Sequence, residues 1–165
     1  QCLVGSEMCI RDSLFTSLNP YKFKITGRTK LFINAFGEEL IIDNATEALR
    51  IACAKTHSTL FEYTAAPIFM QEGQKGAHEW LIEFEVPPAD LETFAEILDK
   101  ELQKLNSDYE AKRLLSLERL KIHQARPHLF TDWLKEKGKL GGQNKVPRLW
   151  NDRTHIDQLL EMNVK

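Results

Sequence analysis

A β-hairpin within residues 60–86 is the feature that most constrains the fold of this chain. Aromatic and β-branched residues are frequent in 60–70, a polar glycine-containing connection follows, and apolar and charged residues then alternate over 79–86. The apolar side chains that share one face of the return strand are Trp80, Ile82, Phe84 and Val86. The opposite face carries Glu79, Leu81, Glu83 and Glu85. Apart from Leu81, this alternation predicts a sheet with one face in solvent.

A second hairpin and a helix are predicted upstream. Apolar and polar residues alternate over 21–25, a turn follows at 26–30, and 31–34 has the pattern of a short strand, so these two strands are expected to pair. Asn44, with Glu47 three residues later, matches a helix N-cap and its capping-box partner. The helical spacing of apolar residues predicts that this helix runs to about Lys55.

Helices dominate the prediction downstream. Asp90 is expected to cap a helix that reaches Asn106, and Asn106 to cap the next helix, which runs to about Leu114. The further elements, in chain order, are a short strand at 120–122, a helix that Pro127 opens and Gly138 closes, and a terminal helix over about 152–162. The predicted fold class is α+β, with a small mixed or antiparallel sheet covered by helices.

The length of 165 residues suits one domain. Residues 1–13 show neither alternation nor a helical period and resemble translated sequencing-adapter readthrough, so we expect an appendage there and a single domain over 14–165. The chain has 22 Lys and Arg against 24 Asp and Glu, a net charge of −2. This balance excludes a global field that would attract nucleic acid or anionic lipid.

The cysteines and the hydropathy pattern indicate the compartment. Cys2, Cys9 and Cys53 provide neither a disulfide framework nor a tetrahedral metal site. No apolar run approaches the roughly 20 residues that cross a bilayer, and the first residues lack the pattern of a secretory leader. We therefore expect a cytoplasmic protein with no membrane partner.

A basic segment near the C-terminus is the part of the sequence best suited to chemistry. Residues 135–153 contain six cations and two anions, a local charge of +4. The cations are Lys135, Lys137, Lys139, Lys145, Arg148 and Arg153. Glycine amides beside cations suit a phosphate or a developing oxyanion, because glycine lets backbone donors approach closely. A solvated surface loop with ordinary lysines has the same composition, and both interpretations stay open at this point.

Other reaction types find no support in the sequence. The glycine segment does not match a Walker phosphate loop, which follows a strand and leads directly into a helix. No two histidines lie four residues apart and none has a cysteine companion, so no metal site held by this domain alone is expected. There is no Gly-x-Ser-x-Gly elbow, and Cys53 lies within a predicted helix.

Four strings carry a resemblance to a known family. They are FTSLNPYKFKITGR (15–28), NAFGEEL (34–40), NSDYEAKR (106–113) and GKLGGQNKVPR (138–148). Together they resemble the auxin-responsive Gretchen Hagen family of acyl-acid amido synthetases, in its bacterial branch, from about Leu14 to the end. That family belongs to the adenylate-forming superfamily, whose members have a large N-terminal domain and a small C-terminal lid. This chain resembles the lid.

The resemblance implies a two-step reaction in which a carboxylic acid and ATP, with Mg²⁺, give an acyl-adenylate, and an amino acid or other amine then displaces AMP. Lys145 matches the lysine of the family's Gln-x-Lys-x-Pro-Arg motif, which lies near the adenylate or the incoming amine, and is the expected catalytic residue. Its motif neighbours Gln143 and Arg148, with Gly141 and Gly142, are expected to contact substrate or nucleotide.

Gly27 and Arg28 match the Gly-Arg segment at the superfamily's interdomain hinge. Two departures limit the transfer. Asp12 is one position out of register with the family's ribose-binding Asp, and Gly37-Glu38 stands where plant members have a lysine. The strings for the acyl pocket and the phosphate loop belong to the missing N-terminal adenylating domain, so this polypeptide alone is expected to be inactive.

Two other classes of protein remain open. A non-catalytic α+β binding module would use the basic segment 135–153 for RNA or another anionic partner, and its affinity would fall steeply with salt. Nucleic acid is the less expected partner because the net charge is −2. A structural or oligomerisation fragment would instead change size with concentration.

Overall fold

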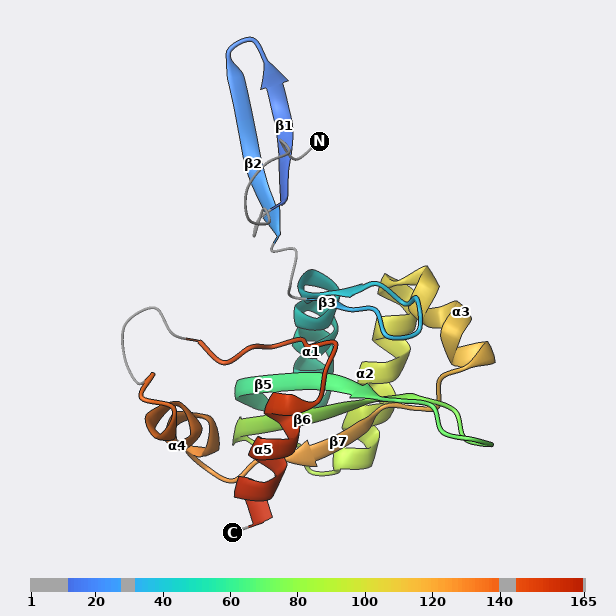
Figure 1. Ribbon diagram of the computed structural model, residues 1–165, viewed down its shortest axis with the longest axis vertical. Coiled ribbons are helices and arrows are strands. Elements are labelled where there is room, and N and C mark those ends of the chain that lie inside the picture. Colours follow the sequence, from blue (N-terminus) through green and yellow to red (C-terminus); the bar gives the residue numbers. More distant parts are fainter. Residues whose placement is uncertain (1–11, 28–31, 140–144, 165) are drawn as a thin grey trace.

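A computed structural model describes residues 12–27, 32–139 and 145–164 (Figure 1). The elements in chain order are β1 (Asp12–Leu18), β2 (Tyr21–Gly27), β3 (Phe32–Ile33), β4 (Leu40–Ile41), α1 (Ile42–Thr56), β5 (Thr59–Ile68), β6 (Ala77–Val86), α2 (Leu91–Leu105), α3 (Ser107–Leu115), β7 (Lys121–Gln124), α4 (Leu129–Glu136) and α5 (Thr154–Val164). This is the α+β fold that the sequence predicts. None of the described helices is long and apolar enough to span a bilayer.

A three-stranded sheet in the order β5-β6-β7 forms the centre of the fold. β5 and β6 are the predicted hairpin, antiparallel, with Tyr63 opposite Ile82. β7 joins β6 in parallel, with Ile122 opposite Trp80. The sheet is therefore mixed, because the chain passes through α2 and α3 before it returns as β7.

Helices cover both faces of this sheet (Figure 1). α1 and α2 pack on the face that carries Trp80 and Ile82, and α4 and α5 pack on the face that carries Leu81. The prediction of one solvated face is therefore wrong. Leu81, the exception in the alternation, is fully buried and marks the second core, which α4 and α5 complete with apolar residues from far along the chain.

Two of the three glutamates on the second face, Glu79 and Glu83, are buried in consequence. Glu83 is 5% exposed, and its carboxylate accepts the backbone N–H of His128 at 2.6 Å and that of Phe130 at 3.5 Å, at the start of α4. A carboxylate at a helix N-terminus satisfies amides that lack partners within the helix. Glu79 is 8% exposed and accepts hydrogen bonds from Arg153 (2.6 Å) and His123 (2.8 Å).

Two predictions upstream of the sheet are also wrong. β2 pairs with β1 rather than with β3, because the tight Asn19-Pro20 connection folds the chain back directly, and β3 pairs with β4. α1 begins at Ile42 without a side-chain cap, since β4 leads straight into it. Asn44 consequently lies inside the helix, where its amide donates to the carbonyl of Leu105 (3.2 Å).

Three other helix ends follow the prediction, whereas α4 begins at Leu129, two residues after the Pro127 that was predicted to open it. Asp90 accepts the N–H of Thr93 (2.9 Å) at the start of α2, and Asn106 accepts the N–H of Tyr109 (2.8 Å) at the start of α3. Gly138 follows α4 with φ +64, a conformation that favours glycine.

Candidate functional site

The segment that carries Lys145 is attached to the outer edge of β5. The N–H of Ala65 donates to the carbonyl of Arg148 (2.9 Å), and the N–H of Trp150 donates to the carbonyl of Ala65 (3.0 Å), which forms a parallel bridge between Ala65 and Leu149. The segment 147–150 thus covers one edge of the sheet although it belongs to no regular strand.

Side chains strengthen this attachment. The Thr64 hydroxyl, which is 1% exposed, donates to the carbonyl of Pro147 at 2.7 Å. Val146 is 6% exposed and packs in the core formed with α4 and α5. Backbone and side-chain contacts therefore fix the chain from Val146 onward.

Lys145 precedes this fixed segment and is exposed. Within the residues that the structure describes, its ammonium has no hydrogen-bond or ion-pair partner. A flexible lysine with a fixed backbone root and no competing partner is free to direct its charge toward an incoming phosphate or carbonyl group.

Arg148, three residues further on, is engaged within the domain. Its Nε donates to Glu62 Oε1 at 2.9 Å, and its guanidinium lies 5.2 Å from the centre of the Tyr63 ring. Burial raises the pKa of Tyr63 above its usual range, so the ring stays a neutral platform for the cation. The nucleotide contact that the motif assigns to Arg148 stays a prediction.

Ion pairs within the domain also engage other cations of the basic segment 135–153. Arg153 contacts Glu79 (2.6 Å) and Asp157 (2.7 Å), and Lys135 lies 3.5 Å from Asp132. Burial would raise the pKa of Glu79, but the hydrogen bonds from Arg153 and then His123 outweigh it and lower the pKa below its ordinary value. With Arg148, half of the six cations are therefore neutralised locally, which weakens the interpretation of 135–153 as one continuous anion-binding strip.

The string 34–40 connects β3 to the first residue of β4, and Glu38 and Leu40 are its buried residues. Glu38 is fully buried, and its carboxylate accepts the backbone N–H of Phe36 (2.7 Å) and lies 2.8 Å from Nε2 of the fully buried His78. Burial would raise the pKa of Glu38, but the hydrogen bond to His78 and its attraction lower it below its ordinary value. Glu38 is therefore held as a carboxylate by a partner on β6.

Two of the four motif strings meet at this turn, and a residue just beyond the lysine motif also reaches it. Asn106 at the start of α3 donates to the carbonyl of Glu39 (3.2 Å), and the Tyr109 ring lies 5.3 Å from that of His78. Asn151, just after the lysine motif, donates to the carbonyl of Phe32 (3.0 Å) and accepts the N–H of Asn34 (2.7 Å). The strings 34–40 and 106–113 are thus neighbours in space although they are far apart in the sequence, and Asn151 links the region after the lysine motif to them.

The other predicted site residues are placed only in part. Gly27 ends β2, opposite Asp12. Arg28, Gly141, Gly142 and Gln143 lie outside the described residues, and their roles stay predictions. Sequence reasoning missed Glu62, Thr64, His78 and Asn151. Their partners lie 40 to 119 positions away, so no local pattern could have identified them.

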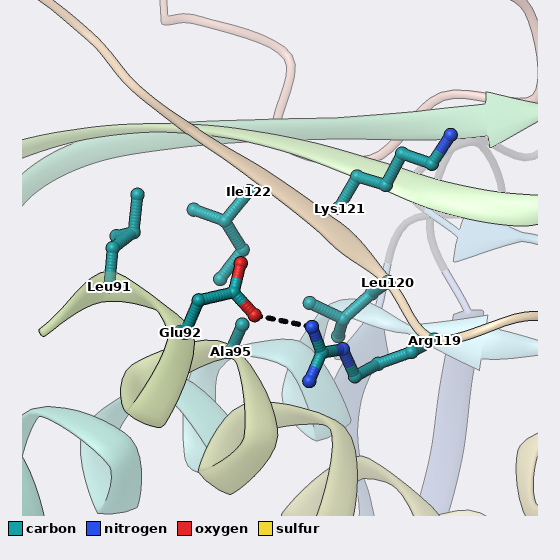
Figure 2. Close-up of a pocket in the computed structure, with 7 residues that line it drawn as sticks. All are labelled: Leu91, Glu92, Ala95, Arg119, Leu120, Lys121 and Ile122. Carbon is teal, nitrogen blue, oxygen red and sulfur yellow. Dashed lines mark hydrogen bonds and ion pairs between the residues drawn. The ribbon is translucent and has the colours of Figure 1, made fainter.

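A pocket of about 240 Å³ lies between α2 and the start of β7 (Figure 2). Its lining residues are Leu91, Glu92, Ala95, Arg119, Leu120, Lys121 and Ile122. Arg119 forms ion pairs with Glu92 and Glu96 at its rim. No predicted site residue contributes to this pocket, so we do not place the chemistry there. Within the described ranges, no three His, Cys, Asp or Glu side chains are grouped so as to hold a metal ion.

The sheet with helices on both faces, and the lysine segment attached to its edge, define a small α+β domain. Residues 43–154 match the family model described as the GH3 family C-terminal domain. This match spans more than half of the chain, and the chain therefore belongs to the GH3 family. Both the family resemblance and the fold class predicted from the sequence are confirmed. Among curated protein sequences none matches.

Solved structures support the same fold. One is titled GH3.15 acyl acid amido synthetase, with a TM-score of 0.69 and 17% identity over 87% of this chain and 28% of that one. A second, AtGH3.15 acyl acid amido synthetase in complex with 2,4-DB, has a TM-score of 0.63 and 17% identity over 87% of this chain and 27% of that one. At this identity the likeness shows the fold alone. The chain spans little more than a quarter of the length of these structures.

Proposed function

We propose that this chain is the C-terminal lid of an ATP-dependent acyl acid amido synthetase, with the domain over 14–165 and an appendage over 1–13. In the first step a carboxylate oxygen attacks the α-phosphorus of ATP and pyrophosphate leaves. In the second, the nitrogen of an amino acid or other amine attacks the acyl carbon, loses a proton and expels AMP. The observation that carries the proposal is Lys145, which is exposed and has no partner among the described residues, next to a segment hydrogen-bonded to β5 in a GH3 C-terminal domain.

Lys145 would stabilise charge at the reacting centre. Its ammonium is proposed to lie near the carbonyl and phosphate oxygens, where closure of the lid excludes water and strengthens electrostatic interactions. Gln143, Gly141 and Gly142 are proposed to contribute polar contacts beside it. Gly27 and Arg28 would form the hinge about which the lid turns.

The missing parts are assigned to the rest of the enzyme. The N-terminal adenylating domain would bind the carboxylic acid and ATP, which agrees with the quarter of the GH3.15 structures that this chain spans. Mg²⁺ would accompany ATP, but the described residues offer no ligand set for it, so no step assigned to this chain involves the metal. We also propose a cytoplasmic location and the bacterial branch of the family.

The experiment joins this chain to the adenylating domain that we propose is encoded upstream of it. ATP–pyrophosphate exchange that depends on a carboxylic acid, and amide formation on addition of amino acids, are expected of the joined enzyme and not of this chain alone. A complete gene without an adenylating domain, or a joined enzyme that forms no acyl-adenylate with any carboxylic acid tested, would contradict the proposal.

A further inference from the structure

We propose that Thr64 and Glu62 of β5 are positioning residues for Lys145, which act by holding residues 146–149 on the sheet edge. The inference rests on the proposed function, because it matters for catalysis only if Lys145 contacts the reacting atoms. It assigns a role to β5, a strand that lies outside all four motif strings.

The first support is the geometry of Thr64. Its side chain is 1% exposed, and its hydroxyl donates to the carbonyl of Pro147 at 2.7 Å, two residues from Lys145. Proline has no N–H with which to join the ladder, so at this position only the carbonyl can attach the segment to β5. Without this hydroxyl the Pro147 carbonyl would lose its donor, so the segment would shift to seek another partner.

The second support is the pair of Glu62 and Arg148. The 2.9 Å contact and the position of the guanidinium 5.2 Å from the Tyr63 ring centre fix Arg148 from two sides. The carbonyl of Arg148 accepts the N–H of Ala65 in the same place. Glu62, Tyr63 and Thr64 of β5, together with Ala65, therefore hold the segment 146–149. The side chain of Lys145, just before this segment, makes no such contact with β5.

The expected consequence of losing these contacts is that the Lys145 ammonium is positioned less precisely. A displacement of about 1 Å at a catalytic group can cost on the order of 100-fold in rate. A residue that fixes the backbone root of Lys145 should therefore affect the rate of the chemical step and leave the binding of ATP unchanged.

The test uses Thr64→Val, which keeps the shape and removes the hydroxyl, and Thr64→Ser, which restores it. In the joined enzyme, Thr64→Val should lower kcat of the Lys145-dependent step about 10-fold or more with KM for ATP within about twofold, and Thr64→Ser should stay close to wild type. In this chain, hydrogen exchange at the Trp150 amide should accelerate in Thr64→Val and not in Thr64→Ser.

A double-mutant cycle separates this proposal from the proposed function. In the Lys145→Ala background Thr64→Val should cause no further loss, because the group that it positions is gone. Wild-type rates in Lys145→Ala overturn the proposed function. A slow Lys145→Ala enzyme with a fully active Thr64→Val, or an equal loss from Thr64→Val in both backgrounds, overturns the positioning role. If Thr64→Val does not fold, Glu62→Gln replaces it in the double-mutant cycle. Full activity of Glu62→Gln, or an equal loss from it in both backgrounds, would then overturn the positioning role.

Discussion

The Nε atom of Arg148 lies 2.9 Å from Oε1 of Glu62, a contact between residues 86 positions apart. This pair joins the lysine motif to the central sheet, and it accounts for the difference between two cations of the same motif. Arg148 is bound within the domain, whereas Lys145 is exposed and, in the described parts of the chain, without a side-chain partner. The two residues should therefore respond differently to substitution.

Arg148→Ala should destabilise this chain by about 1–2 kcal/mol, because it removes a partly exposed ion pair and a cation–π contact. Lys145→Ala should change the free energy of unfolding by no more than about 0.5 kcal/mol. Urea denaturation of the two variants measures the difference. Equal destabilisation by both would contradict the conclusion that Arg148 is engaged by contacts within the domain.

Glu83→Ala should destabilise the fold far more than Glu85→Ala on the same face of β6. The Glu83 carboxylate accepts backbone N–H groups at the start of α4, and a hydrogen bond to a charged group contributes about 1.5–3 kcal/mol. Glu85 is exposed and should matter by less than about 0.5 kcal/mol. Thermal unfolding of both variants provides the comparison. A similar small effect from both would restore the solvated face that the sequence predicts.

Glu38→Gln should destabilise the chain at neutral pH and have little effect in acid. The pKa of Glu38 is lowered in the folded state, so its stabilising contribution is present above its ordinary value of about 4.3 and is lost as the pH falls through the folded value. We expect a difference of about 1.5–3 kcal/mol near pH 7 that closes as the solution is acidified below about pH 4. Urea unfolding as a function of pH tests this, and a difference independent of pH would show that Glu38 is not a carboxylate in the native state.

Gly76→Ala should destabilise the turn of 34–40. A Cβ at this position would lie 2.4 Å from Cζ of Phe36, so the ring must move, and overpacking of this kind costs about 1–3 kcal/mol. The smaller side chain in Phe36→Leu should recover part of this loss in the double variant. Strict additivity of the two substitutions in urea unfolding would show that the ring and the glycine do not interact.

Local patterns were sufficient for the elements whose signals lie within a few residues. The β5–β6 hairpin follows from alternation, and the caps Asp90 and Asn106 bond amides three residues away. The second face of the sheet could not be predicted in this way. Glu83 bonds to the start of α4 45 positions away, and a solvated glutamate and a buried one with distant partners give the same alternation. Only Leu81 distinguished the two.

The candidate site was likewise predictable from local sequence only in part. The lysine motif was recognisable as a string, but its attachment depends on Thr64, which is 83 positions from Pro147. Which of the neighbouring cations find acidic partners likewise depends on the fold, since Arg148 contacts Glu62 of β5 and Arg153 contacts Glu79 of β6. Such long-range pairs form only in the packed fold, and the sequence around each residue gives no signal of them.

The central claim is that this domain delivers the Lys145 ammonium to the reacting centre of a neighbouring domain. Single-turnover rates of adenylation and of amide formation in the joined enzyme test it most directly, with Lys121→Ala as a control for removal of an exposed lysine elsewhere. The account predicts that Lys145→Ala slows at least one of these steps by about 100- to 1000-fold while Lys121→Ala leaves both unchanged. Wild-type rates for both steps in Lys145→Ala would contradict it.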